Sequence, residues 1–411
     1  MKKLFSLVLA VAMVLSMACF ASAEENTTLT IVAWDVGTTP YYQAQKEAFE
    51  ATHPGVTIEY VDVASQDWDT KAGTMLSGGD TSDLFMVKQN INIMNWAQQG
   101  FAEPLTDYIA KDNYDLSGFV GMEPNYALDG TQYALPFRSD FWVLFYNKTL
   151  FEELNLTVPS TWEELVETCK AVKAAKGEDV LPFGIDSPID LAQTLFLEAG
   201  YTYIDTENKC VGFAEGEKVA AWLGEQLTAG LFSKDAPSGG YFSDDFNTGK
   251  VAMYYGSCAG VPYIKPNGFE YAVAPAPSST SEYKSYTIWN RGPIVFKYEG
   301  QDARAEGAYE FVKYLLATPE ISEGWAEAMI AMTPWVAAQQ VEGYEAFVAS
   351  QPALAAVQAR TDIAVSLPSV TGASECRDAL KNLVVALQAG TEPATALADC
   401  VAVCNAALQG K

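Results

Sequence analysis

The feature that most constrains the fold is a pair of apolar runs separated by three polar residues. The first run covers residues 133–137, the second covers residues 141–146, and Arg138, Ser139 and Asp140 lie between them. The second run is rich in aromatic and β-branched residues, which predicts a buried strand. We expect the first run to be a buried strand as well, with the polar triplet as a short interruption. A polar triplet between two buried strands is a natural place for a chain to leave one lobe and enter another. We therefore expect Arg138 and Asp140 on the wall of a cleft between two lobes.

Strands and helices alternate along the rest of the chain. Residues 28–33 have the pattern of a strand, residues 41–51 that of an amphipathic helix, and residues 56–63 that of a second strand. A strand, a helix and a strand in this order predict a parallel pair with a right-handed crossover. The alternation continues to two alanine-rich helices, expected at about 374–389 and 393–408. The pattern indicates an α/β fold with helices on both faces of each sheet.

Three short motifs occur around the polar triplet, in a fixed order. They are YALP at 133–136, FYNK at 145–148 and PSTWEE at 159–164, and the last predicts a capped helix start. In this order and spacing the segment resembles the family 1 extracellular solute-binding proteins, the maltose-binding-protein-like receptors of ABC importers. Further matches are HPGV at 53–56, GKVAM at 249–253 and FVKYL at 311–315, so the resemblance extends over most of the chain.

The resemblance implies the periplasmic binding protein type II fold. Such a chain forms two discontinuous α/β lobes joined by a three-segment hinge, with a ligand cleft between them. The crossings are expected near residues 137–141, 286–290 and 332–337. The expected division is a signal peptide at 1–23, an N-lobe of 24–138 plus 290–332, and a C-lobe of 139–289 plus 333–411.

Size and charge restrict the partners of the protein. A chain of 411 residues, 49% of them hydrophobic, can build two cores. A formal net charge of −27 opposes binding to nucleic acid and to anionic membrane surfaces. With a single histidine, His53, and no cysteine pair at metal-ligand spacing, we expect no metal site and no cofactor. We expect a monomer whose partners are a small-molecule ligand and the transmembrane permease subunits of an ABC importer.

The first 23 residues have the pattern of a secretory signal. Lys2 and Lys3 precede an apolar run at 4–20, and Ala-Ser-Ala at 21–23 offers a cleavage site. We expect an exported protein, in the periplasm or on the outer face of the cytoplasmic membrane. A lipid anchor on Cys19 is an alternative, although Leu15 lies one place too far upstream for the usual lipoprotein signal. Export permits disulfides, but buried thiols are the simpler interpretation of cysteines such as Cys400 and Cys404.

Ligands of open α/β sheets bind beyond the carboxyl ends of the strands, and the predicted hinge crossings add further positions. The expected ligand contacts are Trp34, Asp35, Gln89, Asn90, Arg138, Asp140, Ser187, Tyr255, Trp289, Asn290 and Trp335. A carboxylate such as Asp140 can accept two sugar hydroxyls through charge-assisted bonds worth about 1.5–3 kcal/mol each. The tryptophans can offer flat apolar faces to a sugar ring.

Each of these expectations has a structural alternative. Asp140 could pair with Arg138, and the tryptophans could pack between the lobes or in a core. The sequence also departs in two ways from the sugar-binding relatives that the resemblance suggests. Cys258 occupies a place where many of them have an aromatic residue, and Gln89 and Asn90 replace early acidic contacts.

The expected function is a receptor that captures a small solute by hinge closure and offers it to a permease. A mono- or oligosaccharide is the expected solute, and a polyol, a polyamine or a peptide is the alternative. An exported glycosidase with paired carboxylates is a weaker alternative, because 52 acidic residues make some pair inevitable. A protein that only makes surface interactions is a third. We expect the protein not to be an enzyme, since no nucleophile motif accompanies its single histidine.

Overall fold

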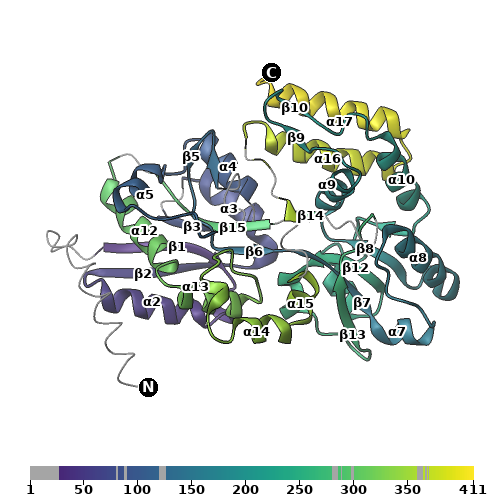
Figure 1. Cartoon of the computed structure of the whole chain (residues 1–411), viewed down its shortest axis with the longest axis horizontal. Coiled ribbons are helices and arrows are strands. Elements are labelled where there is room, and N and C mark those ends of the chain that lie inside the picture. Colours follow the sequence, from purple (N-terminus) through teal and green to yellow (C-terminus); the bar gives the residue numbers. More distant parts are fainter. Residues whose placement is uncertain are drawn as a thin grey trace.

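The computed structural model describes residues 27–79, 82–87, 90–119, 126–279, 286–287, 289–297, 300–358, 364–365, 368 and 370–411. The expected signal peptide and Gln89 lie outside these residues. Within them the chain forms two mixed five-stranded sheets, each with its own helices, arranged as two neighbouring bodies (Figure 1). Among the described residues, no helix is long and apolar enough to cross a membrane.

The first sheet has the strand order β2-β1-β3-β15-β6. Its strands are β1 (Thr27–Trp34), β2 (Val56–Val63), β3 (Leu84–Val87), β6 (Arg138–Asp140) and β15 (Trp289–Val295). Strand β1 pairs in parallel with β2 and β3, while β15 runs antiparallel to β3 and to β6. The parallel β1–β2 pair confirms the crossover unit predicted from the sequence. Two strands from late and middle parts of the chain complete this sheet.

The second sheet has the strand order β11-β8-β12-β7-β13. Its strands are β7 (Trp142–Asn147), β8 (Leu181–Ile185), β11 (Phe232–Ser233), β12 (Val251–Ser257) and β13 (Tyr271–Pro275). Side chains of β7 alternate between two hydrophobic clusters: Trp142 and Leu144 enter one, and Val143 and Phe145 enter the other. The sheet is therefore covered on both faces, as the apolar run at 141–146 predicted.

Helices cover both sheets. Those of the first body are α2 (Tyr41–Thr52), α3 (Trp68–Ser77), α4 (Asn90–Gln98), α5 (Thr106–Asp112), α12 (Asp302–Leu315) and α13 (Pro319–Met329). Those of the second are α7 (Lys148–Glu153), α8 (Trp162–Lys176), α9 (Pro188–Glu198), α10 (Glu217–Thr228), α11 (Phe242–Asn247), α14 (Tyr344–Ser350), α15 (Pro352–Gln358), α16 (Ala373–Gln388) and α17 (Pro393–Leu408). The short 3-10 helices are η1 (Val36–Thr38), η2 (Ser65–Asp67), η3 (Cys258–Tyr263) and η4 (Ala338–Gln340). Three two-stranded pairs lie outside the main sheets: β4 (Ala127–Leu128) with β5 (Thr131–Gln132), β9 (Ile204–Asp205) with β10 (Cys210–Val211), and β14 (Tyr286–Thr287) with β16 (Ala364–Val365).

The start of α8 shows how the sequence sets an element. The Thr161 hydroxyl accepts a hydrogen bond from the Glu164 amide at 3.1 Å, and the Thr161 amide donates to the Glu164 carboxylate at 3.3 Å. This reciprocal cap satisfies two amides that the first helical turn leaves unpaired. The capped start that PSTWEE predicted is therefore confirmed, with Glu164 as the acidic partner.

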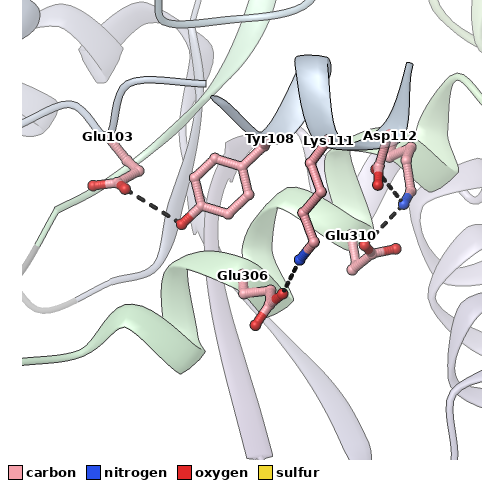
Figure 2. A network of polar contacts seen from close by, with 7 residues as sticks. Glu103, Tyr108, Lys111, Asp112, Glu306 and Glu310 are labelled. Carbon is pink, nitrogen blue, oxygen red and sulfur yellow. Dashed lines mark hydrogen bonds and ion pairs between the residues drawn. The ribbon is translucent and has the colours of Figure 1, made fainter. Parts of the chain in front are cut away.

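Surface contacts hold the short helix α5 against α12 (Figure 2). Lys111 of α5 pairs with Glu306 of α12 at 3.1 Å, and Asp112 pairs with Lys313 at 2.7 Å. Burial, with the negative charge of Glu103 beside it, raises the pKa of Tyr108 to about 12. The Lys111–Glu306 pair is largely exposed, so this contact sets position more than it adds stability.

One prediction for the central stretch is wrong. Residues 133–137 do not form a regular strand: apart from the bridge of Ala134 to Ile294, the strand is the polar triplet itself, β6. The strand forms at the polar triplet because its backbone pairs with β15 on one side and with Met332 on the other. The polar triplet is therefore an extended, buried segment and not a turn.

Candidate functional site

Three passages of the chain lie side by side between the two sheets. Strand β6 belongs to the first sheet and β7 to the second, so the chain crosses at Phe141. Strand β15 enters the first sheet with Trp289 opposite Asp140 in the register. On the other side of β6, Ser139 and Met332 exchange backbone hydrogen bonds of 2.8 and 3.2 Å. The three passages thus form a small ladder, with the polar triplet in its middle.

The polar triplet carries a buried ion pair. Arg138 and Asp140 are two residues apart on a strand and so lie on the same face. Arg138 Nη2 is 3.3 Å from Asp140 Oδ2, and the two side chains are only 6% and 2% exposed. The Arg138 guanidinium carbon also lies 5.7 Å from the centre of the Trp34 ring, a cation–π contact. The structure therefore brings three of the expected site residues together, and it realises the alternative in which Asp140 pairs with Arg138.

The charge of Asp140 also acts on a neighbouring phenol. Tyr126 is completely buried, and burial raises the pKa of this side chain well above its usual value, with the nearby Asp140 carboxylate adding to the effect. Gly292 of β15 lies against the same ring, and a Cβ atom there would be 3.0 Å from it. The ion pair is thus enclosed by packed side chains on the first sheet.

Asp35 follows β1 in a left-handed backbone conformation, with φ of 56°. The next two amides, of Val36 and Gly37, donate to the Asp62 carboxylate at 3.1 and 3.0 Å, which fixes the turn. The Tyr263 hydroxyl of η3 donates a hydrogen bond to the Asp35 carboxylate from the second body. Burial and this carboxylate raise the pKa of Tyr263 to about 12. Asp35 is therefore a half-buried acceptor that already holds a hydroxyl group.

Trp335 is held against the first body. Its ring stacks on Phe119 with centroids 5.3 Å apart and an interplanar angle of 19°, and the Val336 amide donates to the Gly118 carbonyl at 2.9 Å. The Thr333 hydroxyl accepts from the Trp335 amide at 3.2 Å and fixes the turn. One face of the ring is therefore occupied by Phe119, although the side chain as a whole remains half-buried.

Two more contacts join the bodies on another side. Asn95 of α4 donates to the Ser374 hydroxyl of α16 at 3.0 Å, and the Thr371 hydroxyl donates to Asp129 at 3.3 Å. They connect the two bodies in addition to the hydrogen bond from Tyr263 to Asp35. A rotation that separates the bodies about the ladder has to break these contacts.

Two expected contacts have structural roles instead. The Ser187 hydroxyl caps α9, accepting from the Asp190 amide at 3.4 Å and donating to the Asp190 carboxylate. The Tyr255 ring is completely buried and stacks on Trp142 with centroids 5.0 Å apart. Its position is explained by the second core. Burial raises the pKa of the neighbouring Asp186 carboxyl from 3.8 to about 7.

Four expected contacts cannot be placed by their side chains. Gln89 lies outside the described residues. Asn90 begins α4, and Trp289 and Asn290 begin β15, and only their backbone positions belong to the described structure. Their assignment to the site stays a prediction. Among the described residues, no group of histidine, cysteine or acidic side chains could hold a metal ion.

Sequence reasoning missed Tyr263, which supplies the hydroxyl on Asp35. Cys258, the position where an aromatic residue was expected, is buried, and its sulfur accepts a hydrogen bond from the Phe141 amide at 3.4 Å. The aromatic residue lies five positions later, at the end of η3, with 48% of its surface exposed. A tyrosine six residues after the end of strand β12 was the available signal.

Comparisons with known proteins agree with this arrangement. The model of the bacterial extracellular solute-binding protein family matches residues 35–320. The chain is 34% identical over 173 residues to a binding protein of Brucella abortus (strain 2308), which covers 40% of each chain. It is 25% identical over 292 residues to the maltotriose-binding protein of Pyrococcus abyssi, covering 68% of this chain and 60% of the relative. The matches therefore span less than two thirds of the length of these relatives.

The same architecture occurs in solved structures. The GacH receptor of Streptomyces glaucescens, solved unliganded and with acarbose, superposes with a TM-score of 0.77 at 21% identity, covering 94% of this chain and 99% of that one. At this identity the likeness establishes the fold, two α/β lobes, and the two bodies described above are these lobes. With the family model matching most of the sequence, the chain belongs to the bacterial extracellular solute-binding proteins.

Proposed function

We propose that the protein is the exported substrate-binding receptor of an ABC importer, and that it captures a mono- or oligosaccharide between its two lobes. The observation that carries the proposal is the ladder of three chain passages, which joins two separately packed lobes at one narrow place. Such a ladder permits rotation of one lobe against the other, because the backbone pairs lie close to the axis. A ligand then favours the closed arrangement only by touching both lobes.

The residues that would meet the ligand come from both sides of this junction. Asp35 and Tyr263 place a carboxylate and a hydroxyl between the lobes, one from each lobe. A sugar hydroxyl can take the place of either group in their hydrogen bond. Trp335 offers a half-buried ring for the C–H face of a sugar. Arg138 and Asp140 are buried beside Trp34. They would hold the site in place and set its charge.

A sugar ligand is favoured by the relatives. The Pyrococcus abyssi protein is named for maltotriose and the Streptomyces glaucescens receptor was solved with acarbose. Binding without turnover is supported by the same relatives, which are named as binding proteins, and by a junction whose acidic residues are already engaged. The segment at 1–23 exports the protein, which is then either cleaved from this signal or anchored by a lipid on Cys19. The exported protein is a monomer and delivers its ligand to the permease subunits.

A thermal-shift screen with sugars, polyols and polyamines tests the proposal. A ligand that binds only the folded protein raises Tm in proportion to the logarithm of its concentration over Kd. We expect maltotriose or a related saccharide to raise Tm and to be recovered unchanged after incubation. A polyamine or polyol as the sole ligand would keep the receptor role and refute the sugar class. Product release would refute the receptor role, and so would a screen with no ligand at all.

Site variants sharpen the test. Asp35→Asn removes the charge of the Asp35–Tyr263 pair and Tyr263→Phe removes its hydroxyl donor. Both are expected to weaken binding several-fold with little change in unliganded stability. Glu178→Gln is the matched control, because this carboxylate is 90% exposed on the second lobe and far along the chain from the junction. Equal affinity in all three variants would remove the Asp35–Tyr263 pair from the site.

A further inference from the structure

Three buried thiols gather where the last two helices pack together. Cys376 lies in the first turn of α16, and Cys400 and Cys404 lie on α17. They are 0%, 4% and 0% exposed, and in the structure all three are unlinked. The proposed sugar site does not use them. A cluster of this kind in an exported family raises the question of which pair can join.

The contact between Cys376 and Cys404 is reciprocal. Cys376 Sγ lies 3.7 Å from the carbonyl oxygen of Cys404, and Cys404 Sγ lies 3.8 Å from the carbonyl oxygen of Cys376. One helical turn earlier, a Cβ atom on Gly372 would lie 2.6 Å from the carbonyl carbon of Ala407. The two antiparallel helices therefore approach each other most closely at this end. A disulfide needs Cα atoms about 4.4–6.8 Å apart, a separation that only such a close approach allows.

The pair within α17 fits less well. Cys400 Sγ is 4.0 Å from Cys404 Sγ, but the two residues are four positions apart on one helix. Cβ atoms at that spacing are about 5–6 Å apart, whereas a disulfide needs about 3.5–4.5 Å. Joining Cys400 to Cys404 would therefore unwind a turn of α17. A bond between the helices does not require either helix to unwind.

We propose that Cys376 and Cys404 form a disulfide after export, which cross-links α16 to α17. The oxidant is a low-molecular-weight disulfide. One of the two protein thiolates attacks one of its sulfurs and releases one thiol. The other protein thiolate then attacks the protein sulfur of this mixed disulfide and releases the second thiol. Two protons leave the protein thiols, and two electrons reduce the oxidant. Because the thiols are buried in the folded lobe, the exchange takes place while the helices are still closing.

The cross-link would lie between two contacts that matter to the lobes. Ser374, two residues before Cys376, accepts the hydrogen bond from Asn95 of the other lobe. Arg377, the next residue, forms a buried pair with Asp190 at 2.9 Å. A cross-link at Cys376 therefore fixes the turn of α16 that faces the first lobe and carries this ion pair.

Peptide mapping tests the proposal on the exported, full-length chain. Free thiols are alkylated in denaturant and the protein is cut with trypsin after Arg377 and Lys381. Cys376 then lies in the peptide 361–377, and Cys400 and Cys404 lie together in the peptide 382–411. We expect these two peptides as one linked species that carries a single alkyl group and separates on reduction. A linkage within 382–411 alone, or three alkylated cysteines, would overturn the proposal.

Matched variants and a stability measurement complete the test. Cys400→Ser should keep the linked peptides, whereas Cys376→Ser and Cys404→Ser should lose them. The cross-link closes a separation of 28 residues. For a loop of this size, reduction should lower the Tm of the exported wild type by about 5–10 °C. Cys376→Ser should show no change on reduction, and an equal response in that variant would contradict the assignment. None of these readouts depends on a sugar ligand.

Discussion

Replacing Asp140 by alanine separates a structural role of this carboxylate from a role in ligand binding. The side chain is 2% exposed and pairs at 3.3 Å with Arg138, which is 6% exposed. Its removal leaves a guanidinium buried beside the Trp34 ring without its counter-charge. Breaking a buried pair in this way costs about 3–5 kcal/mol of the free energy of unfolding. For a folding unit of roughly 150–250 residues, that loss lowers Tm by about 10 °C.

The assay is urea unfolding of the unliganded protein, followed by tryptophan fluorescence and circular dichroism. Asp140→Ala and Arg138→Met should each lose stability, and the double variant Arg138→Met with Asp140→Leu should recover to within about 1 kcal/mol of the wild type. Glu167→Gln is the control, because its pair with Lys170 is 73% and 56% exposed. An exposed pair of this kind contributes about 0.2–1 kcal/mol.

Two outcomes would refute this reasoning. If Asp140→Ala unfolds at the same urea concentration as the wild type and still loses the ligand, the carboxylate serves the ligand and the ion pair adds nothing to the fold. If the single and the double variants are equally unstable, the loss comes from packing at β6 and not from an unpaired charge.

Three further predictions concern other parts of the molecule. Burial raises the pKa of Asp186 from 3.8 to about 7, so the native state holds a proton that the unfolded state releases, and stability should fall as pH rises from about 4 to 7; Asp186→Asn should flatten this slope in urea titrations, and an unchanged slope would contradict it. Gly372→Ala should lower stability by more than about 2 kcal/mol, because φ is 88° and the added Cβ would meet Ala407, whereas a neutral effect on Tm would show that the helices can move apart. Tyr263→Phe should raise the Kd of the ligand about fivefold by removing the hydrogen bond to Asp35 that joins the lobes, and calorimetry showing the wild-type Kd would exclude it.

The elements whose signal lies within a few residues were predictable from the sequence. Strand β2 and helix α17 have the bounds that the patterns of residues 56–63 and 393–408 indicated. Each shows a clear periodicity or a capped start, and neither needs knowledge of a distant partner. The two-lobed α/β fold also followed, because ordered motifs around the polar triplet carried the resemblance to the family.

The central strand was not predictable, since its signal lies elsewhere in the chain. Arg138, Ser139 and Asp140 look like a turn by composition, yet they are extended because β15 and Met332 supply partners on both sides. Those partners come from more than a hundred residues downstream. Local propensity is a weak guide where pairing across the chain decides the backbone.

The candidate site, too, was predictable from the sequence only in part. Trp34, Arg138 and Asp140 were named from the sequence and do meet, but their mutual contacts give them buried, structural surroundings. Ser187 and Tyr255 were named by the same rule, and a helix cap and a core stack account for them. The rule that ligands bind at strand ends finds the region. It cannot tell a side chain that faces the ligand from one that supports it, because neighbouring positions alternate between these two directions.

The position of the ion pair relative to the ladder explains why a hinge can contain charges at all. Contacts close to an axis of rotation change little in length when the lobes move, so the Arg138–Asp140 pair can stay intact in both arrangements. Contacts between side chains of the two lobes, such as that of Asp35 with Tyr263 and that of Asn95 with Ser374, have to form and break. Hydrogen bonds of this kind are worth about 0.5–1.5 kcal/mol each, which is small enough for a ligand to decide the balance. We therefore expect variants of the Arg138–Asp140 pair to change the stability of the protein. Variants of the side-chain contacts between the lobes should change its affinity for the ligand.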